Sequence, residues 1–357
     1  MQLSNRVDRV RGLFDLLGVD GLVVTDLSNV RWLTGFTGSN AAVVVAVGGL
    51  TLFTDGRYSD QAPMQLSRAN VDADVVIGAD VIGGAIAAVA SLSRLGLEAD
   101  TISWAAQQRF ADACSAGLVA VSAALVELRA VKDRGELDRI ASAVRIADAT
   151  LAEVRLILGA RPTEREVALA LDHGMRSRGA TAEAYETIVA AGPNGALPHA
   201  RPTDRVIGDG DLVVIDVGAL VDGYRSDMTR TFVIGEPTTE QQRHLDVVQE
   251  SQAAGAAAVR AGVSAKLVDK ACRDIIAEAG WADRFTHGTG HGVGLDIHER
   301  PRVNSQTTDV LEAGMVVTVE PGVYLPGVGG VRWEDLLHVT EDGADVLSGS
   351  PKSPVVT

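Results

Sequence analysis

Two apolar runs that each end in a carboxylate constrain the fold of this chain more than any other feature. Leu212-Val-Val-Ile-Asp216 and Met315-Val-Val-Thr-Val-Glu320 have the length and the β-branched content of buried strands. A carboxylate in such a strand is strongly unfavourable unless a positive group lies beside it. The two runs echo each other weakly, with the carboxylate offset by one position, which indicates two related half-units that face one site.

A second carboxylate follows each run. Asp227 comes eleven residues after Asp216, beyond the turn-forming Asp222-Gly223, so a hairpin could bring both side chains to one face. Glu334 follows Glu320 in the same way, across a glycine-rich connection. Four strand-end carboxylates require positive charge nearby, either from bound cations or from a salt-bridge network. The arginines available for such a network are Arg225, Arg230 and Arg332.

The histidines favour the cations. His291 lies in His287-Gly-Thr-Gly-His-Gly-Val-Gly-Leu-Asp-Ile-His298, where glycines let the backbone approach closely and leave the imidazoles as the only large groups. A lone histidine is usually packed or solvated, whereas three histidines within twelve residues of a glycine-rich run indicate a site. Carboxylates together with an imidazole suit Mn²⁺, Co²⁺, Zn²⁺ or Fe²⁺.

The pattern of elements divides the chain into two domains. Alternating helix and strand patterns over the first ~125 residues are typical of an α/β unit, and a charged segment at 128–137 precedes a long helical pattern. We therefore expect the domains to be 1–127 and 128–357. The elements expected within them include a helix over 3–18, a hairpin over Ala41–Val47 and Leu50–Thr54, a helix over 134–158, capped helices from Thr163 and Thr238, and a strand over Val331–Val339.

Composition and charge exclude several classes of partner. With 32 Lys+Arg against 47 Asp+Glu, the net charge of −15 repels phosphate backbones and anionic membranes, so we expect no nucleic acid and no membrane partner. The two distant cysteines, Cys114 and Cys272, make no disulfide framework. Residues 1–10 lack the apolar core of a signal peptide, and we expect a cytoplasmic protein.

The site residues resemble those of the metallopeptidases with the pita-bread fold, namely methionine aminopeptidase, aminopeptidase P and prolidase. The first half, with Gly35-Phe-Thr-Gly-Ser-Asn40 and Phe53-Thr-Asp-Gly-Arg-Tyr58, looks like the N-terminal domain of aminopeptidase P, prolidase and creatinase. The resemblance implies an α/β (α+β) fold, with a creatinase-like N-terminal domain before a pita-bread catalytic domain of two pseudo-symmetric halves. The family's ligands come in the order Asp, Asp, His, Glu, Glu, and this sequence matches them with Asp216, Asp227, His291, Glu320 and Glu334.

The same resemblance implies two divalent metal ions per chain, ~3.5–4 Å apart. Mn²⁺ is the ion we expect first, with Co²⁺, Zn²⁺ or Fe²⁺ as alternatives. Asp227 and Glu334 would bridge the ions, Asp216 would bind one of them, and His291 and Glu320 would bind the other. Glu320 would also carry a proton from the attacking water to the leaving amine.

Five further residues are considered in connection with this expected site. By resemblance, His298 would donate a hydrogen bond to the tetrahedral intermediate, and His199 would face the substrate. Arg332 would orient the bridging carboxylates or bind the substrate carboxylate. Arg302 could hold a substrate carboxylate or merely close a loop. For His287, we expect a structural role at a strand terminus, with a place beside the site as the alternative.

The activity that the resemblance implies is cleavage of the bond before proline, in Xaa-Pro dipeptides or at peptide N-termini. Proline has no N–H and a constrained backbone, so general peptidases bind such bonds poorly. Methionine aminopeptidase lacks this kind of N-terminal domain, and creatinase lacks the ligand set. A non-catalytic peptide-binding module of the same fold and an aminopeptidase without proline specificity remain alternatives. Small Xaa-Pro peptides are the expected partners, and a homodimer is the expected assembly.

Overall fold

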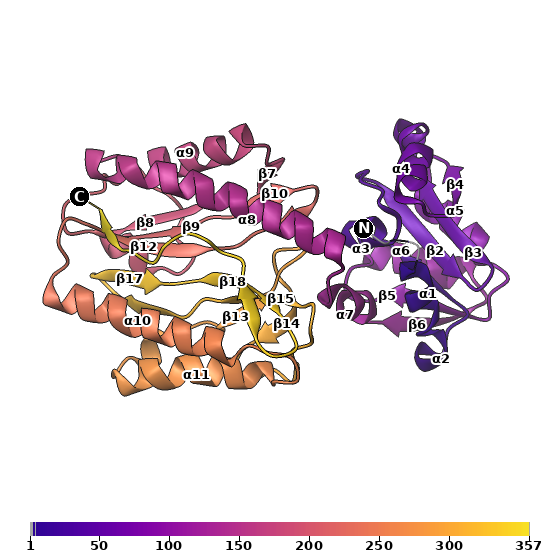
Figure 1. Ribbon diagram of the computed structural model, residues 1–357. Helices are drawn as coiled ribbons and strands as arrows, with labels where there is room; N and C mark the ends of the chain where they lie inside the picture. The colour runs from indigo at the N-terminus through magenta and orange to yellow at the C-terminus, as the bar shows by residue number, and fades with distance from the viewer. Residues whose placement is uncertain (1–2, 4, 357) are drawn as a thin grey trace. The chain divides into compact units, whose positions relative to one another are not determined.

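The computed structural model describes residue 3 and residues 5–356, and the chain divides into two compact units, Met1–Arg129 and Ala130–Thr357. Each unit has its own strands and helices, as Figure 1 shows with the ribbon coloured by residue number. Among the described residues, no helix combines the length and the apolar character that crossing a bilayer requires.

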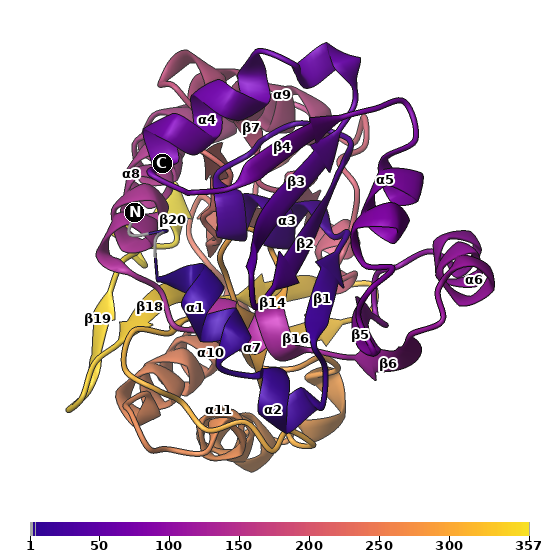
Figure 2. The same ribbon diagram turned by 90° about the vertical axis from the view of Figure 1, so that its right-hand side faces the viewer.

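One sheet organises the first unit, with strands in the order β4-β3-β2-β1-β5-β6, and Figure 2 shows them in this order. The predicted hairpin is confirmed, because β2 pairs with β3 in antiparallel register from Ala41↔Thr54 to Ala46↔Gly49. The strands are β1 Gly21–Val24, β2 Ala41–Ala46, β3 Gly49–Thr54, β4 Asp74–Ile77, β5 Arg94–Glu98 and β6 Gly117–Val121. The helices include α3 Leu27–Thr34, α4 Gln61–Ala69, α5 Val81–Ala88, α6 Trp104–Ala113 and α7 Ala124–Ala130.

The single helix expected over 3–18 is wrong. Two short helices, α1 (Arg6–Arg11) and α2 (Phe14–Leu17), take its place, with Gly12 as the C-cap of the first. Glycine has the lowest helix propensity after proline, which explains why the helix stops there. Residue 4 of the expected helix lies outside the described residues.

The second unit repeats one arrangement twice, a sheet covered by two helices. The two larger sheets run β20-β12-β9-β8 and β14-β13-β15-β18-β19, and smaller sheets are formed by β11-β10-β7 and by β16-β17. In Figure 1, α8 and α9 lie on one side of these strands and α10 and α11 on the other. Helices α8 and α9 pack on the first sheet through one hydrophobic core, and α10 and α11 pack on the second through another, which also includes Leu212 and Val233 of the first sheet. The remaining faces of the two halves are therefore left to form a site between them.

Helix ends in the second unit follow the capping chemistry of the sequence. The capping boxes at Thr163 and Thr238 are confirmed. In each box the threonine side chain accepts a hydrogen bond from the N3 backbone N–H, and the N3 side chain accepts one from the threonine backbone N–H. The pattern over 134–158 is an α-helix only to Val154, and a 3-10 segment follows it. The helices are α8 Arg134–Val154, α9 Glu164–Ser177, α10 Thr239–Ala258 and α11 Ala265–Glu278.

The strand expected over Val331–Val339 is wrong as one element. The chain leaves β17 after Arg332 and enters β18 at Asp335, so it changes sheet at Trp333 and Glu334. The Trp333 side chain is buried, and the Glu334 N–H donates to the carbonyl of Thr229 in the other half (3.2 Å). The break therefore places Glu334 where the two halves meet.

The described part of the second unit contains the strands β7 to β20. They are β7 Ala182–Glu183, β8 Ile188–Ala191, β9 Leu212–Asp216, β10 Ala219–Val221, β11 Tyr224–Arg225, β12 Thr229–Ile234, β13 Gly290–Gly292, β14 Glu299–Val303, β15 Val316–Val319, β16 Gly322–Leu325, β17 Gly329–Arg332, β18 Asp335–Val339, β19 Ala344–Val346 and β20 Val355–Val356.

A buried histidine in α10 predicts acid sensitivity. His244 packs on Trp281 with ring centroids 5.0 Å apart, and among the described residues its Nε2 has no hydrogen-bond partner. Burial lowers the pKa of His244 from 6.5 to about 4. The imidazole of His244 binds a proton more tightly in the unfolded chain than in the folded one. The free energy of unfolding therefore contains the full contribution of the neutral imidazole only above about pH 6.5. It falls as pH drops toward 4, by about 3 kcal/mol in total.

We therefore expect His244→Phe, which keeps an aromatic ring against Trp281, to flatten the pH dependence of stability. Urea unfolding of the two metal-free proteins between pH 7.5 and 4 measures the difference. Equal slopes in both proteins would contradict the prediction. His173→Phe, at an exposed histidine of α9, is the control and should retain the wild-type slope.

Candidate metal centre

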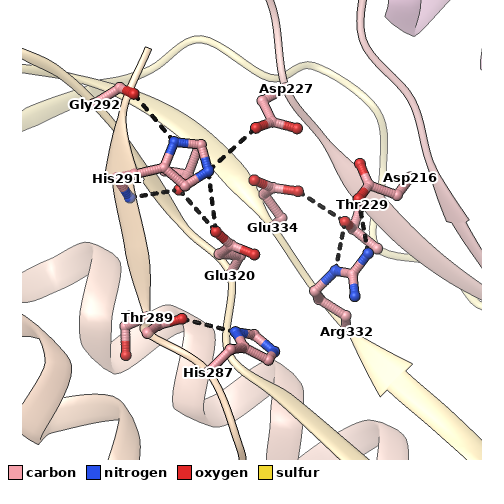
Figure 3. Close-up of polar contacts among 12 residues, drawn as sticks. Asp216, Asp227, Thr229, His287, Thr289, His291, Gly292, Glu320, Arg332 and Glu334 are labelled. Atoms are coloured by element: carbon pink, nitrogen blue, oxygen red, sulfur yellow. Dashed lines mark hydrogen bonds and ion pairs between the residues drawn. The ribbon is translucent and has the colours of Figure 1, made fainter. Parts of the chain in front are cut away.

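The five expected ligands gather in one cavity of about 510 Å³ in the second unit. Figure 3 shows that their side chains point toward one another from both halves. The side chains that line the cavity include Asp216, Asp227, His291, Glu320 and Glu334, and also His199, His298, Arg302 and Arg332.

The first half supplies two carboxylates through one antiparallel pair of strands. Asp216 is the last residue of β9 and lies opposite Thr229, the first residue of β12. Asp227 precedes β12 by two residues, so both side chains emerge at the same end of the sheet. One oxygen from each of Asp216, Asp227 and Glu334 lies within 4.8 Å of the others. The predicted proximity of Asp216 and Asp227 is therefore present.

The second half supplies the imidazole and the other carboxylates. His291 is the central residue of β13, and its Nε2 lies 3.3 Å from Glu320 Oε1 and 3.5 Å from Asp227 Oδ2. Its Nδ1 lies 3.1 Å from the carbonyl oxygen of Gly292, a contact that turns Nε2 toward the carboxylates. At Gly290, a Cβ would lie 2.0 Å from the carbonyl oxygen of Thr318, so glycine is required there for the close approach of the two strands.

The electrostatics of this cluster call for cations. Burial and repulsion from neighbouring carboxylates raise the pKa values of Asp227 and Glu334 well above their usual range. Burial also raises the pKa of Asp216, although Arg332 opposes the shift. Burial acts in the same direction on Glu320, but hydrogen bonding and charge from His291 outweigh it and lower the pKa to about 2. Several buried carboxylates at one point require compensating positive charge.

Arginines do not provide that charge as a network. Of the three arginines considered, all within the described residues, only Arg332 contacts a carboxylate of the cluster. The guanidinium of Arg225 instead binds the carbonyls of Leu295 and Ala184, and Arg230 pairs with Asp335 (2.9 Å). The salt-bridge alternative is therefore wrong. Oxygen donors with one imidazole, in excess of the available positive charge, fit divalent cations.

Arg332 joins several parts of the site. Its side chain is buried, and it donates to Asp216 Oδ2 (2.8 Å), Thr229 Oγ1 (2.9 Å) and the Tyr324 hydroxyl (2.8 Å). It also donates to the carbonyl of Pro198 (3.1 Å), the residue before His199. Thr229 in turn donates to Glu334 Oε2 (2.7 Å). One side chain thus connects a carboxylate of each half with the segment that bears His199.

The sequence did not single out two tyrosines at this site. The Tyr185 hydroxyl lies 2.5 Å from Asp216 Oδ1 and 2.6 Å from Asp227 Oδ1. Burial and the nearby carboxylates raise its pKa well above the usual value, so the phenol stays protonated. No motif marks Tyr185. Tyr324 ends the Val-Glu-Pro-Gly-Val-Tyr segment, and its spacing from Glu320 was a signal that could have indicated it.

His287 is not a purely structural residue. It lines the cavity, and its Nε2 lies 2.8 Å from the Tyr324 hydroxyl, which also receives the hydrogen bond from Arg332. Burial lowers its pKa, so the imidazole is neutral. The structure therefore favours the alternative, in which His287 lies beside the site, over a purely structural role.

The remaining predicted residues surround the carboxylates. The rings of His298 and His291 meet edge to face at 79°, with centroids 4.4 Å apart. Burial lowers the pKa of His298 to about 4, and the charges of His291 and Arg302 act in the same direction. His199 lines the same cavity. Arg302 is exposed there, and its guanidinium makes no hydrogen bond or ion pair with the described residues.

Comparison with known proteins identifies the family. The profile of metallopeptidase family M24 matches residues 138–341, and that of the creatinase/prolidase N-terminal domain matches residues 6–131. The chain therefore belongs to metallopeptidase family M24. This confirms the expected creatinase-like domain followed by a pita-bread domain, and it defines a metal-dependent hydrolase that works with divalent metal ions.

Relatives match over nearly the whole chain. The chain is 33% identical over 348 residues to the Xaa-Pro dipeptidase of Pyrococcus horikoshii, with 97% of each chain covered. It matches the structure of Xaa-Pro dipeptidase from Bacillus anthracis with a TM-score of 0.94 and 36% identity, over 99% of each chain. The structure of X-Pro aminopeptidase from Thermotoga maritima matches with a TM-score of 0.89 and 33% identity, over 98% of this chain and 100% of that one.

Proposed function

We propose that this chain is a metal-dependent exopeptidase that hydrolyses the bond between an N-terminal residue and proline. The observation that supports it most is the gathering of the five ligand-type side chains with His199 and His298 in one cavity. The full-length similarity to Xaa-Pro dipeptidases adds the substrate class. Neither a non-catalytic binding module nor a peptidase without proline specificity is favoured by these relatives.

Asp216, Asp227, His291, Glu320 and Glu334 would hold two divalent ions, with Mn²⁺ expected first and Co²⁺, Zn²⁺ or Fe²⁺ compatible with the same donors. When bound, the ions supply Lewis-acid activation of the scissile carbonyl and of the attacking water. The family resemblance implies that Asp227 and Glu334 would help to hold both ions, and their oxygens lie together with one of Asp216.

Proton transfer falls to Glu320. The leaving nitrogen of proline comes from a tertiary amide with no hydrogen, so it must receive a proton as the bond breaks. Glu320 lies at the cavity wall beside His291 and would take the proton of the attacking water and deliver it to that nitrogen. His298, neutral at working pH, would donate its N–H to the oxyanion as charge develops there.

Hydrolysis assays test this proposal directly. Purified protein loaded with Mn²⁺, Co²⁺ or Zn²⁺ is offered Ala-Pro, Ala-Pro-Ala and Ala-Ala. We expect turnover of the proline substrates and little of Ala-Ala. No turnover of either proline substrate would contradict the proposal, and binding without cleavage would indicate a non-catalytic module. Equal turnover of Ala-Ala would indicate a peptidase without proline specificity.

Arg302 is proposed to bind the carboxylate of a dipeptide substrate. Its unpaired guanidinium lines the cavity close enough to His298 to lower the pKa of that imidazole. We expect Arg302→Met to raise KM for Ala-Pro by about 10- to 100-fold with little change in kcat, as for loss of a charge-assisted hydrogen bond of about 1.5–3 kcal/mol.

Ala-Pro amide, which lacks the carboxylate, separates this role from a general effect on the site. We expect its KM to be the same in wild-type protein and in Arg302→Met. Arg201→Met is the control, because Arg201 lines the same cavity but pairs with Glu186 (3.1 Å). An equal rise in KM for Ala-Pro and for its amide would rule out the assignment.

The family resemblance also supports a homodimer in the cytoplasm. Sedimentation of the purified protein would show a particle of twice the chain mass, and fractionation of cells would place it with cytoplasmic markers. A monomer in sedimentation would contradict the first part.

A further inference from the structure

A buried ion pair adjoins the segment that carries His298. The ammonium of Lys132 lies 3.0 Å from Glu299 Oε2, and the side chains are only 1% and 2% exposed. Glu299 directly follows His298 in the chain and begins β14. The two partners are 167 positions apart in sequence, and neither belongs to the five ligands. A pair so completely removed from water is strongly unfavourable unless both charges remain matched.

Backbone contacts fix the position of Lys132, whose side chain then extends to Glu299. Its N–H donates to the carbonyl of Gly314 (2.9 Å), and Val131 forms a β-bridge with Met315. Asp133 then caps α8 through the Glu136 amide. The ammonium is thus presented from a fixed point of the second unit, beside the strand that leads to Glu320.

The Glu299 carboxylate organises the loop that ends at His298. Its Oε1 accepts from the Asp296 N–H (3.1 Å), while Oε2 faces Lys132. At Gly294, a Cβ would lie 2.6 Å from Glu299 Oε2, so the chain bends around the carboxylate where a side chain is missing. Arg225 contacts the other side of the loop. Its backbone N–H donates to the Gly294 carbonyl (2.9 Å), and its Nε donates to the Leu295 carbonyl (3.1 Å).

The charge of Lys132 affects the orientation of His298 through Glu299. Without Lys132, the buried Glu299 carboxylate would lose the ammonium that lies beside it, and the loop would open to water or move away from it. Since His298 ends this loop and stands edge to face with His291, a small displacement would misdirect its N–H.

We propose that Lys132 is a positioning residue, which holds His298 in its working orientation through Glu299. The inference rests on the proposed function, because that function assigns His298 to the oxyanion.

Amide hydrogen exchange tests the positioning without any need for activity. In Lys132→Met, we expect the segment 294–300 to exchange about 10-fold faster or more, since the Asp296 N–H loses its fixed acceptor. Segments at β9 and β12 should be unchanged. Lys270→Met is the matched control, because it removes an exposed lysine paired with Asp274 and should leave 294–300 unaffected. Wild-type exchange of 294–300 in Lys132→Met would overturn the proposal.

A double-mutant cycle on Ala-Pro hydrolysis tests the link to His298. We expect Lys132→Met to lower kcat by about 10- to 100-fold with KM and metal content little changed, and to have almost no further effect in a His298→Ala background. The same loss in both backgrounds would overturn the proposal. The double variant K132M/E299Q, which removes both charges and keeps an oxygen for the Asp296 N–H, should recover most of kcat. A wild-type protein without activity would contradict the proposed function alone, and the exchange experiment would still decide the role of Lys132.

Discussion

Asp227→Asn is expected to abolish retention of the divalent ions and to lower kcat/KM by about 10³-fold or more, equal to about 4 kcal/mol. Asp227 is 5% exposed, and one of its carboxylate oxygens lies within 4.8 Å of an oxygen of Asp216 and an oxygen of Glu334. An amide keeps the shape but removes one anionic oxygen, so a bridging position would lose the charge that binds both ions. Elemental analysis after gel filtration, together with Ala-Pro kinetics, measures both effects.

A second carboxylate-to-amide change controls for the chemistry of the substitution. Asp345 is 72% exposed and pairs with His338 in the same unit, so Asp345→Asn should keep the wild-type metal content and activity. Two ions per chain in Asp227→Asn would refute a bridging role for Asp227, whatever its activity.

Arg332→Met is expected to lower kcat/KM by about 100-fold or more and to destabilise the fold by about 3–5 kcal/mol, the usual consequence of breaking a buried ion pair. Methionine retains the length of the side chain but leaves Asp216, Tyr324 and the Pro198 carbonyl without their shared donor. Loss of the positive charge also raises the pKa of Asp216 further, since Arg332 opposes that shift.

Urea unfolding and Ala-Pro kinetics measure these two effects. Arg332→Lys should not restore activity, because one ammonium cannot replace a planar guanidinium that reaches several acceptors at once. Arg165→Met serves as the control, since Arg165 forms an exposed pair with Asp204 and its loss should leave both quantities unchanged. Wild-type kcat/KM in Arg332→Met would show that these contacts do not organise the site.

Local signals in the sequence sufficed for much of the fold. Capping boxes predicted the starts of helices at Thr163 and Thr238, and two apolar runs on either side of Gly48-Gly49 predicted the β2–β3 hairpin. These features depend on hydrogen bonds between residues close together in the chain, so the local sequence specifies them. The interrupted elements were less visible. Nothing local distinguishes Val331–Val339 from one continuous strand, because the break at Glu334 follows from pairing with two different sheets.

By itself, the sequence determined which side chains we expect to bear the chemistry: carboxylates at the ends of apolar strands, and His291 among glycines that permit close approach. Their roles as ligands remain predictions. Only the tertiary structure decided which charges meet. It directed Arg225 to carbonyls and Arg332 to Asp216, and it brought Tyr185 and His287 to the cavity. Such pairings depend on how two separately packed halves face each other, a relation that the periodicity of either half does not contain.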